Sequence, residues 1–174
     1  MNQTSNEKVV QWLRTAIAAE KEALINYLDL AAQTKDTSGK NMFINLARDE
    51  FGHMNSLEKE LAAVQSDQKW VPAGAEQSLI EKIVPSLKNT GHIFQGSQGD
   101  IKTNILIMAR DGEKKALIFY EEMAQQMTDP SAQSLLKRLS RMEQAHYEIL
   151  QAEIDYLNKT GFWMGFKEIS LETT

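Results

Sequence analysis

Glutamate, tyrosine and histidine recur at one spacing in the two halves of this chain of 174 residues. In each half, a glutamate is followed 7 positions later by a tyrosine and 30 positions later by a Glu-x-x-His pair, and a shift of 93 positions superimposes the two sets. The repeated residues are Glu20, Tyr27, Glu50 and His53 in the first half, and Glu113, Tyr120, Glu143 and His146 in the second. Four carboxylates and two imidazoles repeated in this way form a ligand set for two metal ions.

The spacing and the surroundings of these residues favour a buried metal site. Residues three positions apart lie on one face of a helix, so each Glu-x-x-His pair can direct both side chains toward one ion. Apolar residues flank the four glutamates at helical spacing, as Leu46 and Leu57 flank Glu50, which predicts burial of the carboxylates. Burying four negative charges is very costly without compensation, and two divalent cations would cancel them. The two tyrosines, Tyr27 and Tyr120, either hydrogen-bond to ligand carboxylates across the protein or are ordinary buried tyrosines.

The elements that must position these residues are long helices. Proline and glycine are scarce and clustered, and apolar residues step by 3 or 4 positions, which is typical of helices. We predict helices at about 5–33, 40–65, 101–127 and 130–158, with a connection at 66–100 and a C-terminal tail at 159–174. Short turns make each pair of helices antiparallel, and the long connection permits a crossover. The expected fold is therefore all-α, a ferritin-like four-helix bundle with one long crossover between the second and third helices.

The composition is that of one globular domain spanning residues 1–174. The chain is 42% hydrophobic and 25% charged, with a net charge of −5 that argues against a nucleic-acid partner. It has no cysteine, which excludes disulfides, iron–sulfur clusters and thiolate zinc sites. The polar N-terminal segment and the lack of a long apolar run predict neither a signal peptide nor a membrane span, so we expect a cytoplasmic protein. The apolar tail is expected to cap the bundle or to pack at a subunit interface.

Two pairs of segments resemble rubrerythrins, which belong to the ferritin-like superfamily. AIAAEKEALINYLDLA and EKKALIFYEEMA are followed by LARDEFGH and LSRMEQAH, and the resemblance extends over residues from about 10 to 157. The resemblance implies a di-iron centre, although the ligand types alone leave manganese and zinc open. The implied iron ligands are Glu20, Glu50, His53, Glu113, Glu143 and His146.

The chain differs in three respects from the families that it resembles. It lacks the four cysteines of a rubredoxin-type iron site, so an external donor, such as a rubredoxin-like protein, would have to supply electrons. Rubrerythrins tend to have an additional glutamate one turn before the third-helix ligand, where this chain has Arg110, which puts efficient peroxidase turnover in doubt. Bacterioferritins bind haem through a methionine that follows the second-helix glutamate, where this chain has Phe51, so we expect no haem.

Three functional hypotheses follow from the sequence. The first is a di-iron oxidoreductase, expected as a homodimer, whose diferrous centre reduces hydrogen peroxide or dioxygen. Under this first hypothesis, the four glutamates bind iron as terminal or bridging ligands, and each histidine binds one iron. The second is a ferroxidase that handles iron inside a closed shell. The third is a helical bundle with a vestigial metal site.

Overall fold

The computed structural model describes residues 3–66, 68–70, 77–87 and 103–164. These residues contain five helices and no β-strand, so the predicted all-α class is confirmed. Besides the four predicted long helices, a short helix forms within the connection, where the sequence predicts a weak helical piece near 77–87. The helices are α1 (Gln3–Gln33), α2 (Thr37–Gln65), α3 (Leu79–Leu87), α4 (Thr103–Gln126) and α5 (Pro130–Thr160).

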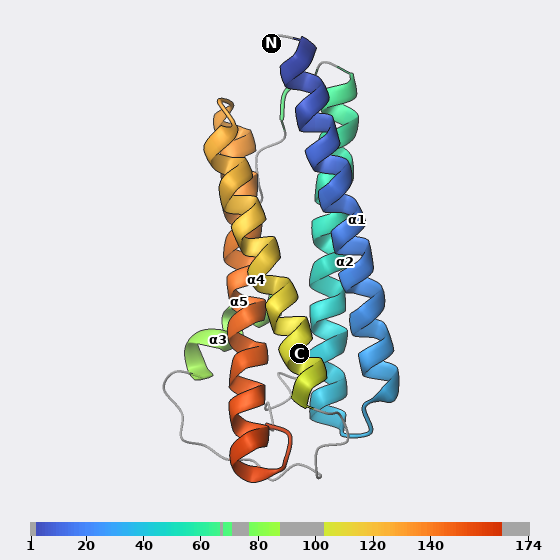
Figure 1. Cartoon of the computed structure of the whole chain (residues 1–174), viewed down its shortest axis with the longest axis vertical. Helices are drawn as coiled ribbons and strands as arrows, with labels where there is room; N and C mark the ends of the chain where they lie inside the picture. The colour runs from blue at the N-terminus through green and yellow to red at the C-terminus, as the bar shows by residue number, and fades with distance from the viewer. Residues whose placement is uncertain (1–2, 67, 71–76, 88–102, 165–174) are drawn as a thin grey trace, which may run out of the picture.

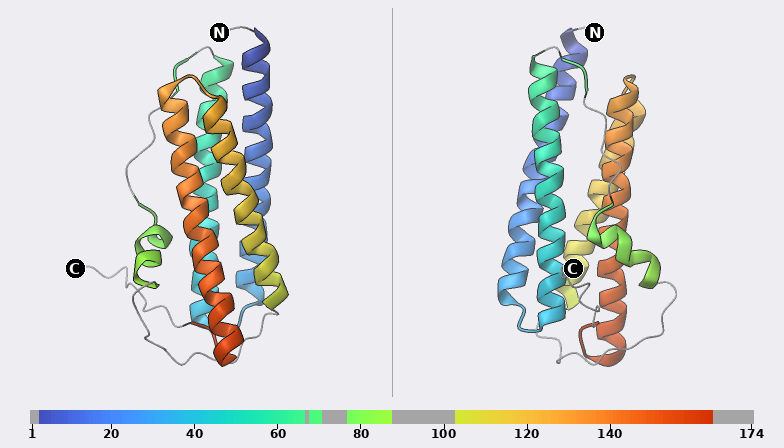
Figure 2. Two further views of the ribbon diagram at one scale, coloured as in Figure 1. Left: turned by 60° about the vertical axis from the view of Figure 1, so that its left-hand side comes forward. Right: turned by 180° about the vertical axis from the view of Figure 1, so that it is seen from behind.

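The four long helices form two antiparallel hairpins that lie against each other. One hairpin is α1 with α2, and the other is α4 with α5 (Figure 1). Helices α2 and α4 run in the same direction, and the short helix α3 packs mainly beside α5 (Figure 2). Much of the predicted crossover at 66–100 lies outside the described residues. This arrangement brings one face of every long helix toward the interior.

The 93-residue repeat extends to the residues that begin the second helix of each hairpin. Asp36 accepts hydrogen bonds from the backbone N–H groups of Ser38 and Gly39, at 2.9 and 3.1 Å. Asp129 does the same for Ser131 and Ala132, at 2.8 and 3.1 Å. An aspartate in this position satisfies N–H groups that have no partner within the helix. Helix α2 therefore begins at Thr37, three residues before the predicted start at residue 40.

Two apolar clusters fill the interior on either side of the middle of the bundle. One contains Phe43, Leu46 and Ile149, and the other contains Leu13, Leu57 and Leu136, all with exposures of 0–1%. The predicted ligands fall between the two clusters along every long helix. Both ends of the bundle therefore exclude water from its middle.

The first residues after α5 fold back onto the bundle. Trp163 is fully buried and packs edge-on against Phe43, with ring centroids 5.8 Å apart. A Cβ atom at Gly39 would lie 2.7 Å from the Trp163 ring, so only glycine fits there without movement. The Met164 N–H donates a hydrogen bond to Glu153 Oε1 at 2.9 Å. This part of the tail caps the bundle, and residues 165–174 lie outside the described part.

No described helix combines the length and the apolar composition that a transmembrane span needs.

Candidate metal centre

The structure brings the six predicted ligands together from all four long helices. Their carboxylate oxygens and imidazole nitrogens fall into two groups, within each of which the atoms lie within 4.8 Å of one another. One group is Glu20, Glu50, His53 and Glu143, and the other is Glu50, Glu113, Glu143 and His146. Glu50 and Glu143 belong to both groups. The arrangement is therefore two adjacent groups that could each hold a cation and that share two carboxylates, with one glutamate and one histidine at each end.

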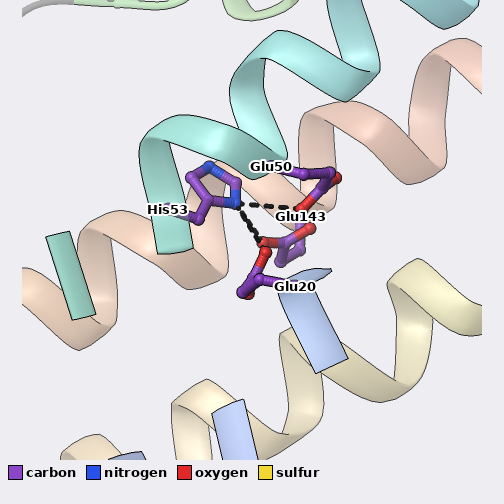
Figure 3. A group of neighbouring side chains, drawn as sticks. All are labelled: Glu20, Glu50, His53 and Glu143. Atoms are coloured by element: carbon purple, nitrogen blue, oxygen red, sulfur yellow. Dashed lines mark hydrogen bonds and ion pairs between the residues drawn. The ribbon is translucent and has the colours of Figure 1, made fainter. Parts of the chain in front are cut away.

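The first group is centred on the imidazole of His53. Its Nδ1 atom lies 2.9 Å from Glu143 Oε1, 3.2 Å from Glu20 Oε2 and 3.3 Å from Glu50 Oε2. Figure 3 shows the ring facing these carboxylates. Since α1, α2 and α5 each contribute, the group depends on the packing of both hairpins.

The second group is centred on His146. Its Nδ1 atom lies 3.0 Å from Glu50 Oε1, 3.3 Å from Glu143 Oε2 and 3.8 Å from Glu113 Oε2. The two imidazole rings are stacked, with centroids 5.5 Å apart and planes inclined by 22°. Each ring thus presents Nδ1 to the carboxylates and leaves Nε2 on the outer side.

Several atoms of the cluster have no hydrogen-bond partner, although they are buried. Within the described part of the chain this holds for Glu50 Oε1, His146 Nδ1 and both carboxylate oxygens of Glu143. Glu50 Oε1 and His146 Nδ1 are 3.0 Å apart without hydrogen-bond geometry between them. Buried polar atoms in proteins almost always have partners. Converging carboxylate oxygens and imidazole nitrogens fit cations once the imidazole protons are displaced, so these residues fit a pair of metal ions.

The carboxyl groups of the cluster have displaced pKa values in the metal-free protein. Burial, together with the contact with Glu50, raises the pKa of Glu20 to about 7. Burial also raises the pKa of Glu113 well above its usual value, as does the charge of Glu50. For Glu143, burial raises the pKa, but the charge of His53 and contacts with both imidazoles outweigh it and lower the pKa to about 2. The two unshared carboxyls therefore hold protons more tightly than shared Glu143 does.

The two imidazoles hold their protons firmly. Burial lowers the pKa of His53, but the charges of Glu143 and Glu20 outweigh this effect and hold it well above the usual value. The charge of Glu50 and the contact with Asp49 likewise outweigh the effect of burial and hold the pKa of His146 well above its usual value. Protons thus balance part of the negative charge when no cation is present. A metal ion must displace them, because only a neutral imidazole can bind it.

The two tyrosines of the repeat contact carboxylates on the opposite hairpin. Tyr27 of α1 donates a hydrogen bond to Glu113 of α4, and Tyr120 of α4 donates one to Glu20 of α1. Burial and the neighbouring carboxylates raise the pKa of both phenols well above 10, so both remain protonated donors. Each tyrosine therefore holds one unshared carboxylate in place.

Sequence reasoning missed one contributor, Asp49. Its Oδ2 atom lies 3.2 Å from Nε2 of His146 and makes a hydrogen bond to that ring. A hydrogen bond from the outer nitrogen of a ligand imidazole to a carboxylate fixes the ring orientation. The available signal was the position of Asp49 directly before Glu50, on the helix that faces His146.

Arg110, which replaces the additional glutamate of rubrerythrins, interacts outside the cluster. Its guanidinium donates hydrogen bonds to Asp111, at 2.6 and 3.0 Å, and to Gln151, at 2.6 Å. It also lies over the ring of Tyr147, 5.8 Å from the centroid. None of these partners is one of the six predicted ligands.

The fold and the buried cluster define a ferritin-like helical protein, and comparison with known proteins agrees. A hypothetical protein from Pyrococcus furiosus is 22% identical, with a TM-score of 0.64 over 87% of this chain and 90% of that one. A two-domain protein from Anabaena variabilis, with DJ-1/ThiJ/PfpI-like and ferritin-like domains, is 16% identical, with a TM-score of 0.63. That match covers 97% of this chain and 41% of the longer protein. At these identities the likeness shows the fold alone.

Family membership rests on the sequence itself. The rubrerythrin family model matches residues 11–154, which is most of the chain. The chain therefore belongs to the rubrerythrin family. No curated protein is a significant match.

Proposed function

We propose that this protein holds two iron ions and reduces hydrogen peroxide or dioxygen. The observation that carries the proposal is that Glu50 and Glu143 each belong to both ligand groups. Two such carboxylates would hold two cations side by side. Bound iron would supply the two electrons that reduction of peroxide to water requires, and each ion would contribute one of them.

The six ligands would hold the two ions in two different ways. Glu50 and Glu143 would bridge the ions, Glu20 and His53 would complete one end, and Glu113 and His146 the other. The site is deeply buried, since none of the six ligands is more than 4% exposed. The apolar clusters above and below limit the access of water to the site.

The tyrosines would position the unshared carboxylates during turnover. Their hydroxyl groups are the nearest phenolic protons to the centre, because each already donates to a carboxylate of the cluster. They are therefore the candidates for proton supply to a reduced oxygen. The protons and electrons consumed must be replaced from outside, so we propose an external donor protein of the rubredoxin type.

We also propose that the protein is a homodimer formed through the hairpin of α1 and α2. This hairpin exposes four large apolar side chains: Ile25 (48%), Leu28 (50%), Ile44 (38%) and Phe51 (52%). Three of the four positions related to them by the 93-residue shift carry polar residues, namely Glu121, Lys137 and Gln144. The repeat thus serves as an internal comparison. The α1–α2 hairpin exposes large apolar side chains at all four of these positions, whereas the α4–α5 hairpin does so at one of them, Ile118 (43%), and elsewhere at Met108 (73%).

Anaerobic loading followed by a peroxide titration tests the proposed reaction. Ferrous protein should consume about one peroxide per two ions, with loss of the ferrous signal, because each peroxide takes two electrons. A chain that binds ferrous iron but leaves peroxide unchanged would contradict the oxidoreductase. Rapid oxidation by dioxygen, together with a large hollow oligomer, would favour the ferroxidase alternative.

A further inference from the structure

The two ends of the centre contain the same kinds of residues but differ in two contacts. His53 Nδ1 lies 3.2 Å from Glu20, whereas His146 Nδ1 lies 3.8 Å from Glu113; the second difference is at Nε2. Each end has one unshared glutamate, one histidine and one tyrosine, and both use the same shared carboxylates. Nε2 of His146 meets Asp49 at 3.2 Å. Nε2 of His53 is buried, and among the described residues it has no hydrogen-bond partner. The larger difference therefore lies behind the imidazoles, where only His146 has a carboxylate partner among the described residues.

The sequence repeat gives the origin of this difference. A shift of 93 positions takes Asp49 to Met142, whereas Glu50 and His53 go to Glu143 and His146. A thioether sulfur is only a weak hydrogen-bond acceptor, and it carries no charge. The second half of the chain thus lacks the carboxylate that the first half supplies.

The contact matters because of the nitrogen that faces the carboxylates. Both rings present Nδ1, so an imidazole that binds a cation carries its proton on Nε2. Asp49 accepts a hydrogen bond from the Nε2–H of His146, which fixes the tautomer and the ring orientation and makes Nδ1 a stronger ligand. The corresponding N–H of His53 would stay buried without an acceptor among the described residues, which disfavours that tautomer.

We propose, building on the di-metal centre above, that its two positions are inequivalent. The position of Glu113 and His146 takes up a divalent cation first and holds it more tightly. Asp49 is the positioning residue that sets this order, through His146. When metal is scarce, the chain therefore carries one ion at the His146 end, and the His53 end fills last and empties first.

Exchanging the two residues between the halves of the repeat tests the proposal. The probe is Co²⁺ alone, supplied at one equivalent per chain, with the occupancy of each position read from anomalous scattering in crystals. Stepwise affinities come from calorimetry. The unaltered protein should hold most of the cobalt at the His146 end. Asp49→Met should abolish the preference and weaken the tighter step by about 10–100-fold. Met142→Asp should strengthen the weaker step, and the two occupancies should become similar.

The controls separate this effect from a general loss of structure. Asp29→Met makes the same change on the exposed side of α1 and should leave both steps unaltered. Equal occupancies in the unaltered protein would overturn the inequivalence without any variant, and so would a preference that survives Asp49→Met. If the unaltered protein binds no Co²⁺ and no ferrous iron, the proposed function itself fails. Binding of two equivalent ions removes only the present inference.

Discussion

Tyr27 donates a hydrogen bond to Glu113, which lies on the opposite hairpin. The repeat supplies the reciprocal pair, in which Tyr120 donates to Glu20. Each hairpin therefore orients a ligand carboxylate of the other. Docking of the two hairpins and assembly of the proposed metal centre are consequently coupled.

Replacing Tyr27 by phenylalanine should weaken the metal position at Glu113. The variant leaves a buried carboxylate oxygen without its donor, and loss of such a supporting hydrogen bond lowers metal affinity by about 10–100-fold. A Co²⁺ titration measures the change. Tyr147→Phe is the matched control, because Tyr147 packs under Arg110 and keeps its ring. Equal affinities for the two variants would show that the Tyr27 contact does not support metal binding.

Loss of a shared carboxylate should remove both ions, and loss of an unshared one should remove about one. Glu50→Ala takes a ligand from both groups, whereas Glu20→Ala takes a ligand from one. Metal content per chain after ferrous loading and gel filtration measures the difference. Glu58→Ala, on the exposed side of α2, should keep both ions. If the Glu50 and Glu20 variants lose the same amount of metal, Glu50 does not bridge. A vestigial bundle predicts instead that Glu50→Ala changes only stability, in the stabilising direction or not at all.

Glu153 should make the protein less stable as the pH rises. Burial raises the pKa of this carboxyl from 4.5 to about 8, while its Oε1 accepts the Met164 N–H. Between these pH values the unfolded chain ionises and the folded one does not, so the free energy of unfolding falls. Glu153→Gln removes this dependence. Its stability relative to the unaltered protein should therefore increase between pH 4.5 and 8, on the order of 1–3 kcal/mol. Urea unfolding at several pH values measures this, and a difference that is constant with pH would contradict it.

The proposed dimer should dissociate when the α1–α2 hairpin receives the polar residues of its counterpart. Leu28→Glu and Phe51→Gln each install the residue that the 93-residue shift places on the other hairpin. Light scattering after size exclusion should report a monomer for the double variant and a dimer for the unaltered protein. Metal content should not change, because both side chains are exposed. Ile118→Glu, on the exposed side of α4, is the control and should remain dimeric. A double variant that remains dimeric places the interface elsewhere.

The sequence predicts the helices and the cluster well because both depend on local spacing. Glu50 and His53 share a helical face wherever the helix lies, and the repeat then indicates the corresponding pair. The sharing of Glu50 and Glu143 between two groups could not be predicted, since it depends on how the hairpins approach each other. Asp49 was missed for a similar reason, because its partner His146 lies on another helix and Met142 interrupts the repeat at the corresponding position.

The central claim is that Glu50 and Glu143 hold two redox-active irons. The most direct test is the iron content of protein purified without added metal, with an absorption spectrum recorded before and after peroxide. We predict about two irons per chain and a near-ultraviolet iron absorption that peroxide increases in the reduced protein. Protein that is free of metal and does not take up ferrous iron would contradict the account, despite the geometry of the six ligands.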